Sequence, residues 1–201
     1  MPDIDIPYFT VIRDSREKPK NGWWFPAEGR CAGTVVATLK TGDYSIEGLT
    51  DAVTIERKAS AVEFAANLFV ESDRFRRELE RMESFRFAVV ACEFPLIELA
   101  EYPERSQLGN SIKRRLKIRG PQLMKRLASL QRDYPYVDWV FDRNAYDRAE
   151  KFLNRIWAAH CRGEIATTAD IAGLATPPSS FPAPSLAGFT GIANSFGGNH
   201  D

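Results

Sequence analysis

The chain opens with short apolar runs rich in β-branched and aromatic residues. These runs predict β-strands at residues 8–14, 34–39 and 51–57. They are separated by roughly 10 to 20 residues, which favours an antiparallel β-meander over a βαβ unit.

The hydrophobic pattern changes after residue 60. Apolar residues recur there at helical intervals and predict helices over residues 60–69 and 72–85, with Phe75, Leu79 and Met82 on one face of the second. Further strands are predicted at 86–94 and 136–142, and further helices at 121–133 and 144–161. Strands followed by alternating helices and strands predict an α/β domain, with a mixed central β-sheet flanked by helices, over residues 1–162.

The composition shifts again beyond this domain. Residues 163–201 are rich in Pro, Gly and Ser and carry almost no charge, which predicts a flexible or loosely docked tail. Its Phe181, Phe189 and Phe196 could anchor on a partner.

Charge is informative only through its distribution. Lys plus Arg and Asp plus Glu both number 27, so the net charge argues neither for nor against nucleic acid. The segment from Arg105 to Arg132, however, contains no acidic residue. It carries nine basic ones: Arg105, Lys113, Arg114, Arg115, Lys117, Arg119, Lys125, Arg126 and Arg132. Such a segment favours sequence-independent binding to DNA phosphates, the alternative being a solvated basic face without chemistry.

Several classes of protein are disfavoured. Three widely spaced cysteines and two histidines argue against a structural zinc site or a disulfide framework. No apolar run approaches the roughly 20 residues that span a bilayer, and the amino terminus lacks a signal pattern. We therefore expect a soluble, cytoplasmic protein without a membrane partner.

The candidate chemistry lies in the stretch "TGDYSIEGLTDAVTIERKAS". Asp43 follows a turn glycine, and Glu56 and Lys58 end a predicted strand on one face, because alternate strand residues share a face. Arg57 points to the other face unless the strand bends. Two carboxylates can hold Mg²⁺ or Mn²⁺, and a nearby lysine can orient water or neutralise phosphate charge, which is the chemistry of phosphodiester hydrolysis. The alternative is that Asp43 caps a turn and that Glu56 and Lys58 form a surface cross-strand pair.

The D…E-x-K arrangement is typical of restriction-endonuclease-like (PD-(D/E)XK) nucleases, and the flanking motifs narrow the comparison. "DSRE" follows the first strand, "GDYSI" the second and "TIERKAS" the third, and "DRFRREL" opens a helix. In this order the motifs resemble the XPF/Hef family of structure-specific DNA endonucleases. The closest likeness is to the small single-domain versions carried by phages and prophages, which would place the protein at the nucleoid of a bacterial host.

The resemblance implies roles for individual residues. Asp43 and Glu56 would be metal ligands, Lys58 the catalytic lysine, and Arg57 a phosphate-binding or bracing residue. The first acidic motif would add Asp14 and Glu17 beside the metal. Basic residues would contact DNA: Arg16, Arg74, Lys113, Arg114, Arg115, Lys117 and Arg119. Arg74 could instead pair with Glu71 or Glu78 on its own helix.

The sequence departs from the family at two points. Val62 stands where an aspartate is expected, so Glu63 either replaces that aspartate or the site lacks one outer carboxylate. Larger family members carry a tandem helix-hairpin-helix module, and the tail of this sequence shows no helical pattern that would match it. Trp139, Phe141, Phe152 and Trp157 could serve a homodimer interface or an ordinary core.

Three functions remain open at this point. The leading one is a metal-dependent DNA endonuclease acting near a branch, flap or fork in repair or recombination. The others are a catalytically silent DNA-binding or scaffolding subunit, and an α/β protein whose acidic pair is only structural.

Overall fold

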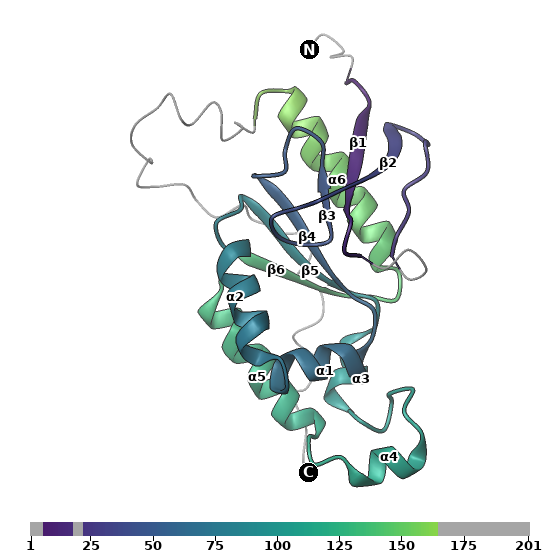
Figure 1. The fold of residues 1–201 in the computed structure, drawn as a ribbon, viewed down its shortest axis with the longest axis vertical. Coiled ribbons are helices and arrows are strands. Elements are labelled where there is room, and N and C mark those ends of the chain that lie inside the picture. Colours follow the sequence, from purple (N-terminus) through teal and green to yellow (C-terminus); the bar gives the residue numbers. More distant parts are fainter. Residues whose placement is uncertain (1–5, 18–21, 165–201) are drawn as a thin grey trace, which may run out of the picture.

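The computed structural model describes residues 6–17 and 22–164, which form a β-sheet with helices on both faces (Figure 1). The strands are β1 (Phe9–Asp14), β2 (Cys31–Ala37), β3 (Tyr44–Ile46), β4 (Val53–Lys58), β5 (Phe87–Cys92) and β6 (Val137–Phe141). The helices are α1 (Ala61–Phe69), α2 (Ser72–Met82), α3 (Leu96–Ala100), α4 (Asn110–Arg115), α5 (Gly120–Asp133) and α6 (Ala145–Cys161). The predicted tail lies outside the described residues from residue 165 onward.

The sheet is mixed. Its strand order is β2-β1-β3-β4-β5-β6. Strand β3 is antiparallel to both β1 and β4, whereas β4, β5 and β6 run parallel to one another. The predicted α/β class, with a mixed sheet flanked by helices, is confirmed.

The predicted antiparallel meander is wrong. Strand β2 pairs with β1 in parallel, and the unpredicted β3 is inserted between β1 and β4. Strand β3 has only three residues, all of them buried, so it shows no alternation that a pattern search could detect. The direction of β2 depends on how the chain returns after β1, which local sequence does not encode.

Two apolar clusters hold the layers together, one on each face of the sheet. Of the helices in the described residues, α6 covers one face, and α1, α2, α3 and α5 cover the other (Figure 1). Phe152 and Trp157 pack in the α6 cluster, whereas Trp139 and Phe141 pack in the other. All four aromatic residues thus have packing partners within the chain, and dimerisation stays a prediction. No described helix is both long and apolar enough to cross a membrane.

Candidate active site

A tight turn positions Asp43. Gly42 has a backbone φ of +77°, and a Cβ atom at this position would lie 2.1 Å from the Oγ1 atom of Thr54. Only glycine accepts both the positive φ and this close approach to β4. The turn is fixed by two bonds: the Asp43 amide donates to the Ile55 carbonyl at 2.7 Å, and the Asp43 Oδ2 accepts from the Arg57 amide at 2.8 Å.

Glu56 and Lys58 occupy the same face of β4, as predicted. The Lys58 Nζ donates to the Glu56 Oε1 at 2.6 Å, and the two residues are only 5% and 6% exposed. The Lys58 ammonium also lies 4.9 Å from the centre of the Phe75 ring on α2, within range of a cation–π interaction. Burial on this scale excludes the alternative of a surface cross-strand pair.

The carboxylates at this site are electrostatically strained. Burial raises the pKa of Asp43 to about 8, and the nearby charge of Glu56 adds to the effect. Burial likewise raises the pKa of Glu56, with Lys58 opposing the shift and Glu78 reinforcing it. Burial lowers the pKa of Lys58, but Glu56 and Glu78 outweigh it and raise that pKa overall. The cluster therefore holds its lysine as a cation and favours a further positive charge.

Arg57 points to the opposite face of β4 and braces it. Its Nε donates to the Glu93 Oε1 at 2.6 Å and its Nη1 to the Glu17 Oε1 at 2.8 Å. The guanidinium lies 5.8 Å from the centre of the Trp23 ring, and the Trp23 indole nitrogen donates to the same Glu93 oxygen. Burial lowers the pKa of Arg57, yet these two carboxylates raise it overall. Of the two roles considered for Arg57, these contacts match bracing.

In the first acidic motif, "DSRE", the Asp14 carboxylate is hydrogen-bonded to Arg16 of the same motif. The Asp14 Oδ1 accepts from the backbone amide and the Nε of Arg16, both at 2.7 Å. The Asp14 Oδ2 accepts from the Arg16 Nη2 at 3.0 Å and from the Leu39 amide at 2.7 Å. Asp14 is buried, and Glu17 is bonded to Arg57. Both predicted outer ligands thus form ion pairs with arginines, while the nearby charge of Glu17 also raises the pKa of Asp43.

Glu78 is a site residue that the sequence reading did not identify. It lies on α2 one turn after Phe75, and its carboxyl group is close enough to Glu56 to raise the pKa of that residue. Glu78 belongs to the "DRFRREL" motif, whose sequence alone indicates only a possible ion pair with Arg74 on the same helix. Glu63, by contrast, caps its own helix: its Oε2 accepts from the Ala59 amide, and its amide donates to the Ser60 Oγ. Glu63 is thus committed to the start of α1.

The basic residues predicted to contact DNA fall into two groups. Arg16 and Arg74 lie outside the basic segment of residues 105–132 and are largely exposed, although Arg74 pairs with Glu71 at 3.2 Å, as the alternative proposed. The others belong to α4 or follow it, on the side of the molecule where α3 lies (Figure 1). Their exposed members are Arg114, Arg115 and Lys117. Lys113 and Arg119 are partly buried and donate to backbone carbonyls.

The residues present fit a magnesium ion better than a zinc ion. Among the described residues no group of three or more His, Cys, Asp or Glu is arranged to hold a metal, and all three cysteines are free thiols. Magnesium commonly takes one or two carboxylates and retains several waters, whereas structural zinc requires four protein ligands. Asp43 and Glu56 supply the two carboxylates that a magnesium ion needs, and a divalent cation would relieve the repulsion between them.

Comparisons with known proteins give low similarities. No protein-family model matches the chain, and no curated protein does. Among solved structures, XPF from Aeropyrum pernix has a TM-score of 0.48 and 21% identity over 73% of this chain. The same protein in a complex with DNA has a TM-score of 0.47 and 22% identity over 74%. The chain spans 64% of the length of each, and neither similarity assigns it to a family.

Proposed function

We propose that the chain is a divalent-metal-dependent DNA endonuclease of the restriction-endonuclease-like type, acting near branched, flap or fork structures. The observation that carries the proposal is the placement of Asp43. Its carboxylate is fixed on the backbone of β4 beside a buried Glu56–Lys58 pair. Burying an acid and a lysine beside a second, half-buried acid is costly for a fold, so their grouping at one point supports a catalytic use.

Asp43 and Glu56 would hold the ion, which is Mg²⁺ or Mn²⁺ in the proposal. When bound, the ion would lower the pKa of a water molecule and neutralise charge on the scissile phosphate. Asp43 is already oriented by the Arg57 amide, so its carboxylate needs little reorganisation to bind. Glu56 would release a proton or its lysine contact in exchange for the ion.

Lys58 acts as a cation in this scheme. Its raised pKa keeps the ammonium protonated, so it cannot serve as a general base at neutral pH. It is suited to donate a hydrogen bond to a phosphate oxygen or to the attacking water, where it stabilises developing negative charge. Arg57 would support the site from the opposite face, and the largely exposed Arg16 and Arg74 would contact the DNA backbone.

The test is cleavage of labelled fork, flap, nicked and plain duplex DNA in the presence of Mg²⁺. We expect Asp43→Asn and Lys58→Ala each to reduce the cleavage rate at least 100-fold while leaving the affinity for DNA within about threefold, since both act on the transition state. Asp51→Asn, which alters an exposed surface carboxylate, is the control and should retain activity.

Two results would decide against the proposal. If the wild-type chain binds DNA but shows no metal-dependent cutting, it is a DNA-binding or scaffolding subunit. If it neither binds nor cuts, its acidic cluster is structural.

A further inference from the structure

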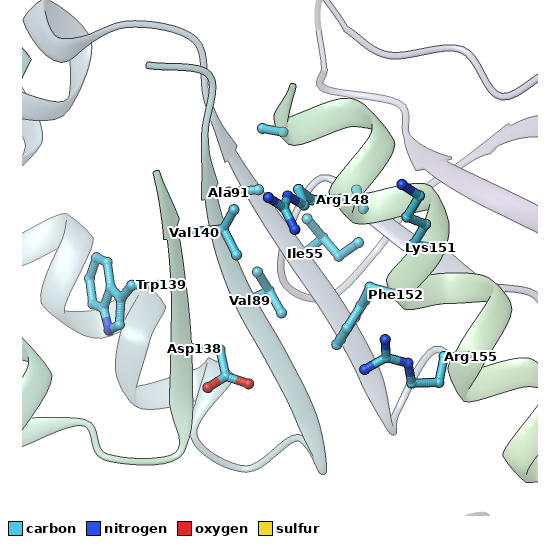
Figure 2. Close-up of a pocket in the computed structure, with 12 residues that line it drawn as sticks. Ile55, Val89, Ala91, Asp138, Trp139, Val140, Arg148, Lys151, Phe152 and Arg155 are labelled. Carbon is cyan, nitrogen blue, oxygen red and sulfur yellow. The ribbon is translucent and has the colours of Figure 1, made fainter. Parts of the chain in front are cut away.

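A cavity of about 220 Å³ lies between the sheet and α6 (Figure 2). Ile55 lines it, so it is on the face of β4 opposite Glu56 and Lys58, because alternate strand residues share a face. Its floor is formed by the apolar side chains of Ile55, Val89 and Val140. Phe152 of α6 contributes an aromatic ring to one wall, and the Trp139 side chain projects away toward the other face of the sheet (Figure 2). The cavity is therefore an apolar pocket with one aromatic wall.

Three cationic side chains from α6 line this cavity. Arg148, Lys151 and Arg155 are three and four residues apart, so they follow one side of the helix over about 10 Å. Arg148 forms an ion pair with Asp142 at 3.0 Å, and Asp138 of β6 stands on the wall opposite Arg155 (Figure 2). Counting these two acids, the rim still carries a net positive charge.

One end of the cavity lies near the carboxyl-terminal ends of β4, β5 and β6, where the proposed active site also lies. Lys58 pairs with Cys92 in the parallel register of β4 and β5, and Cys92 pairs with Phe141 of β6. Asp142, the partner of Arg148, directly follows that last pair. The cationic row thus begins at the carboxyl ends of these strands and runs away from them along α6.

The size of the cavity suits one aromatic ring. An apolar cavity of about 150 Å³ is enough to accept benzene, and this one is larger. Single-stranded nucleic acid is commonly bound by aromatic side chains that stack on bases together with cations that follow the phosphates. Asp138 adds a carboxylate that can accept a hydrogen bond from the amino group of a base.

We propose that this cavity binds one unpaired base of a DNA single strand, stacked on Phe152, with the strand's phosphates lying along Lys151 and Arg155. The inference rests on the proposed function, because the strand would be the single-stranded arm of a branched substrate. It adds a substrate feature: the arm leaves the cleavage site and passes between β6 and α6.

The test measures DNA binding by fluorescence anisotropy, without divalent metal, using a single-stranded oligonucleotide and a duplex of the same length. The double variant Lys151→Ala/Arg155→Ala should weaken single-strand binding at least fivefold and change duplex binding less than twofold. Its log–log salt dependence for single strands should become shallower by about 1.4, which corresponds to two lost phosphate contacts. Arg162→Ala, which removes an exposed cation from the end of the same helix outside the cavity, is the matched control.

A second variant tests the base pocket directly. Ala149→Leu places extra volume in the cavity and should abolish the fluorescence quenching of a 2-aminopurine base in the single strand, while phosphate-dependent affinity is largely retained. If this variant fails to fold, the exposed double variant alone decides the question.

The proposal is overturned if single-strand and duplex binding fall equally, or if neither changes. It is also overturned if the double variant alters the sedimentation coefficient instead, since the cavity would then be an interface between copies of the chain. These readouts require no cleavage. A failure here leaves the nuclease proposal standing, whereas an absence of metal-dependent cutting leaves the single-strand binding site standing and removes only its role in holding a substrate for cleavage.

Discussion

Asp43 shows how one side chain can be both fixed and strained. Its carboxylate accepts a hydrogen bond from the Arg57 amide, yet burial and Glu56 raise its pKa to about 8. In the unfolded chain the same group titrates near 3.8. Between these two values the folded state holds a proton that the unfolded state has released, so the contribution of Asp43 to stability falls as pH rises from about 4 to 8.

This difference predicts a pH-dependent gain from Asp43→Asn. The amide oxygen can still accept from the Arg57 amide, while the charge is removed. In EDTA, the variant should melt about 3 to 8 °C above the wild type at pH 8, with the gap closing near pH 4. Thermal unfolding followed by circular dichroism at both pH values checks this. A gap of equal size at pH 4 and pH 8 would mean that Asp43 is not the strained group.

Gly42 is predicted to tolerate no other residue without a loss of stability. Gly42→Ala would require a side chain at φ +77° and place a Cβ atom against Thr54. A residue other than glycine in the left-handed region costs about 1–2 kcal/mol, and overpacking adds about 1–3 kcal/mol. We expect a loss of about 2–5 kcal/mol in the free energy of unfolding, measured by urea denaturation. Gly48→Ala is the comparison, because Gly48 also has a positive φ but has open space around it. Equal losses in the two variants would show that packing against Thr54 is not important.

At the scale of elements, β4 and α2 together build the acidic cluster. Strand β4 places Glu56 and Lys58 on one face and Arg57 on the other. Helix α2 supplies Phe75 and Glu78 to the same point, three residues apart and therefore on one side of the helix. The alternation in β4 could be predicted because it is a local property. The approach of Glu78 could not, because it depends on how α2 packs against the sheet.

Helix α4 offers a test of the predicted DNA surface. It is a short helix with no buried residue, and its last turn is basic. Arg114→Ala/Arg115→Ala should lower the affinity for any DNA by roughly tenfold at moderate salt and reduce the salt slope for duplex by about two. Filter binding over a range of salt concentrations measures both quantities. Arg30→Ala, at an exposed position on the β2 side of the molecule, should change neither; an unchanged slope in the double variant would assign α4 to a plain solvated surface.

At the scale of the whole molecule, sequence patterns predicted most elements but not their arrangement. Helices α1, α2, α5 and α6 and strands β1, β4, β5 and β6 were predicted near their positions, because each has a strong apolar period or a long apolar run. The parallel pairing of β1 with β2 and the insertion of β3 were missed, since both depend on long-range chain return. Helices α3 and α4 were missed because they have only five and six residues.

In the site, too, the features set by local sequence could be predicted and those set by long-range packing could not. The grouping of Asp43, Glu56 and Lys58 followed from a turn glycine and strand alternation, and the structure brings these residues to one end of β4. The predicted outer carboxylates Asp14 and Glu17 form ion pairs with Arg16 and Arg57, and their role beside a metal stays a prediction. Which arginine pairs with each carboxylate depends on the positions of the folded side chains, and the spacing of residues along the sequence does not specify these positions.

The central claim is that Asp43 and Glu56 hold a divalent cation, and calorimetric titration of the full chain with Mn²⁺ tests it most directly. The wild type is predicted to bind one ion, with a Kd that tightens as pH rises from 6 to 8, because binding must displace protons from carboxyls of raised pKa. Asp43→Asn should weaken this binding at least tenfold, and Asp51→Asn should not change it. Binding of equal strength in wild type and Asp43→Asn would contradict the account.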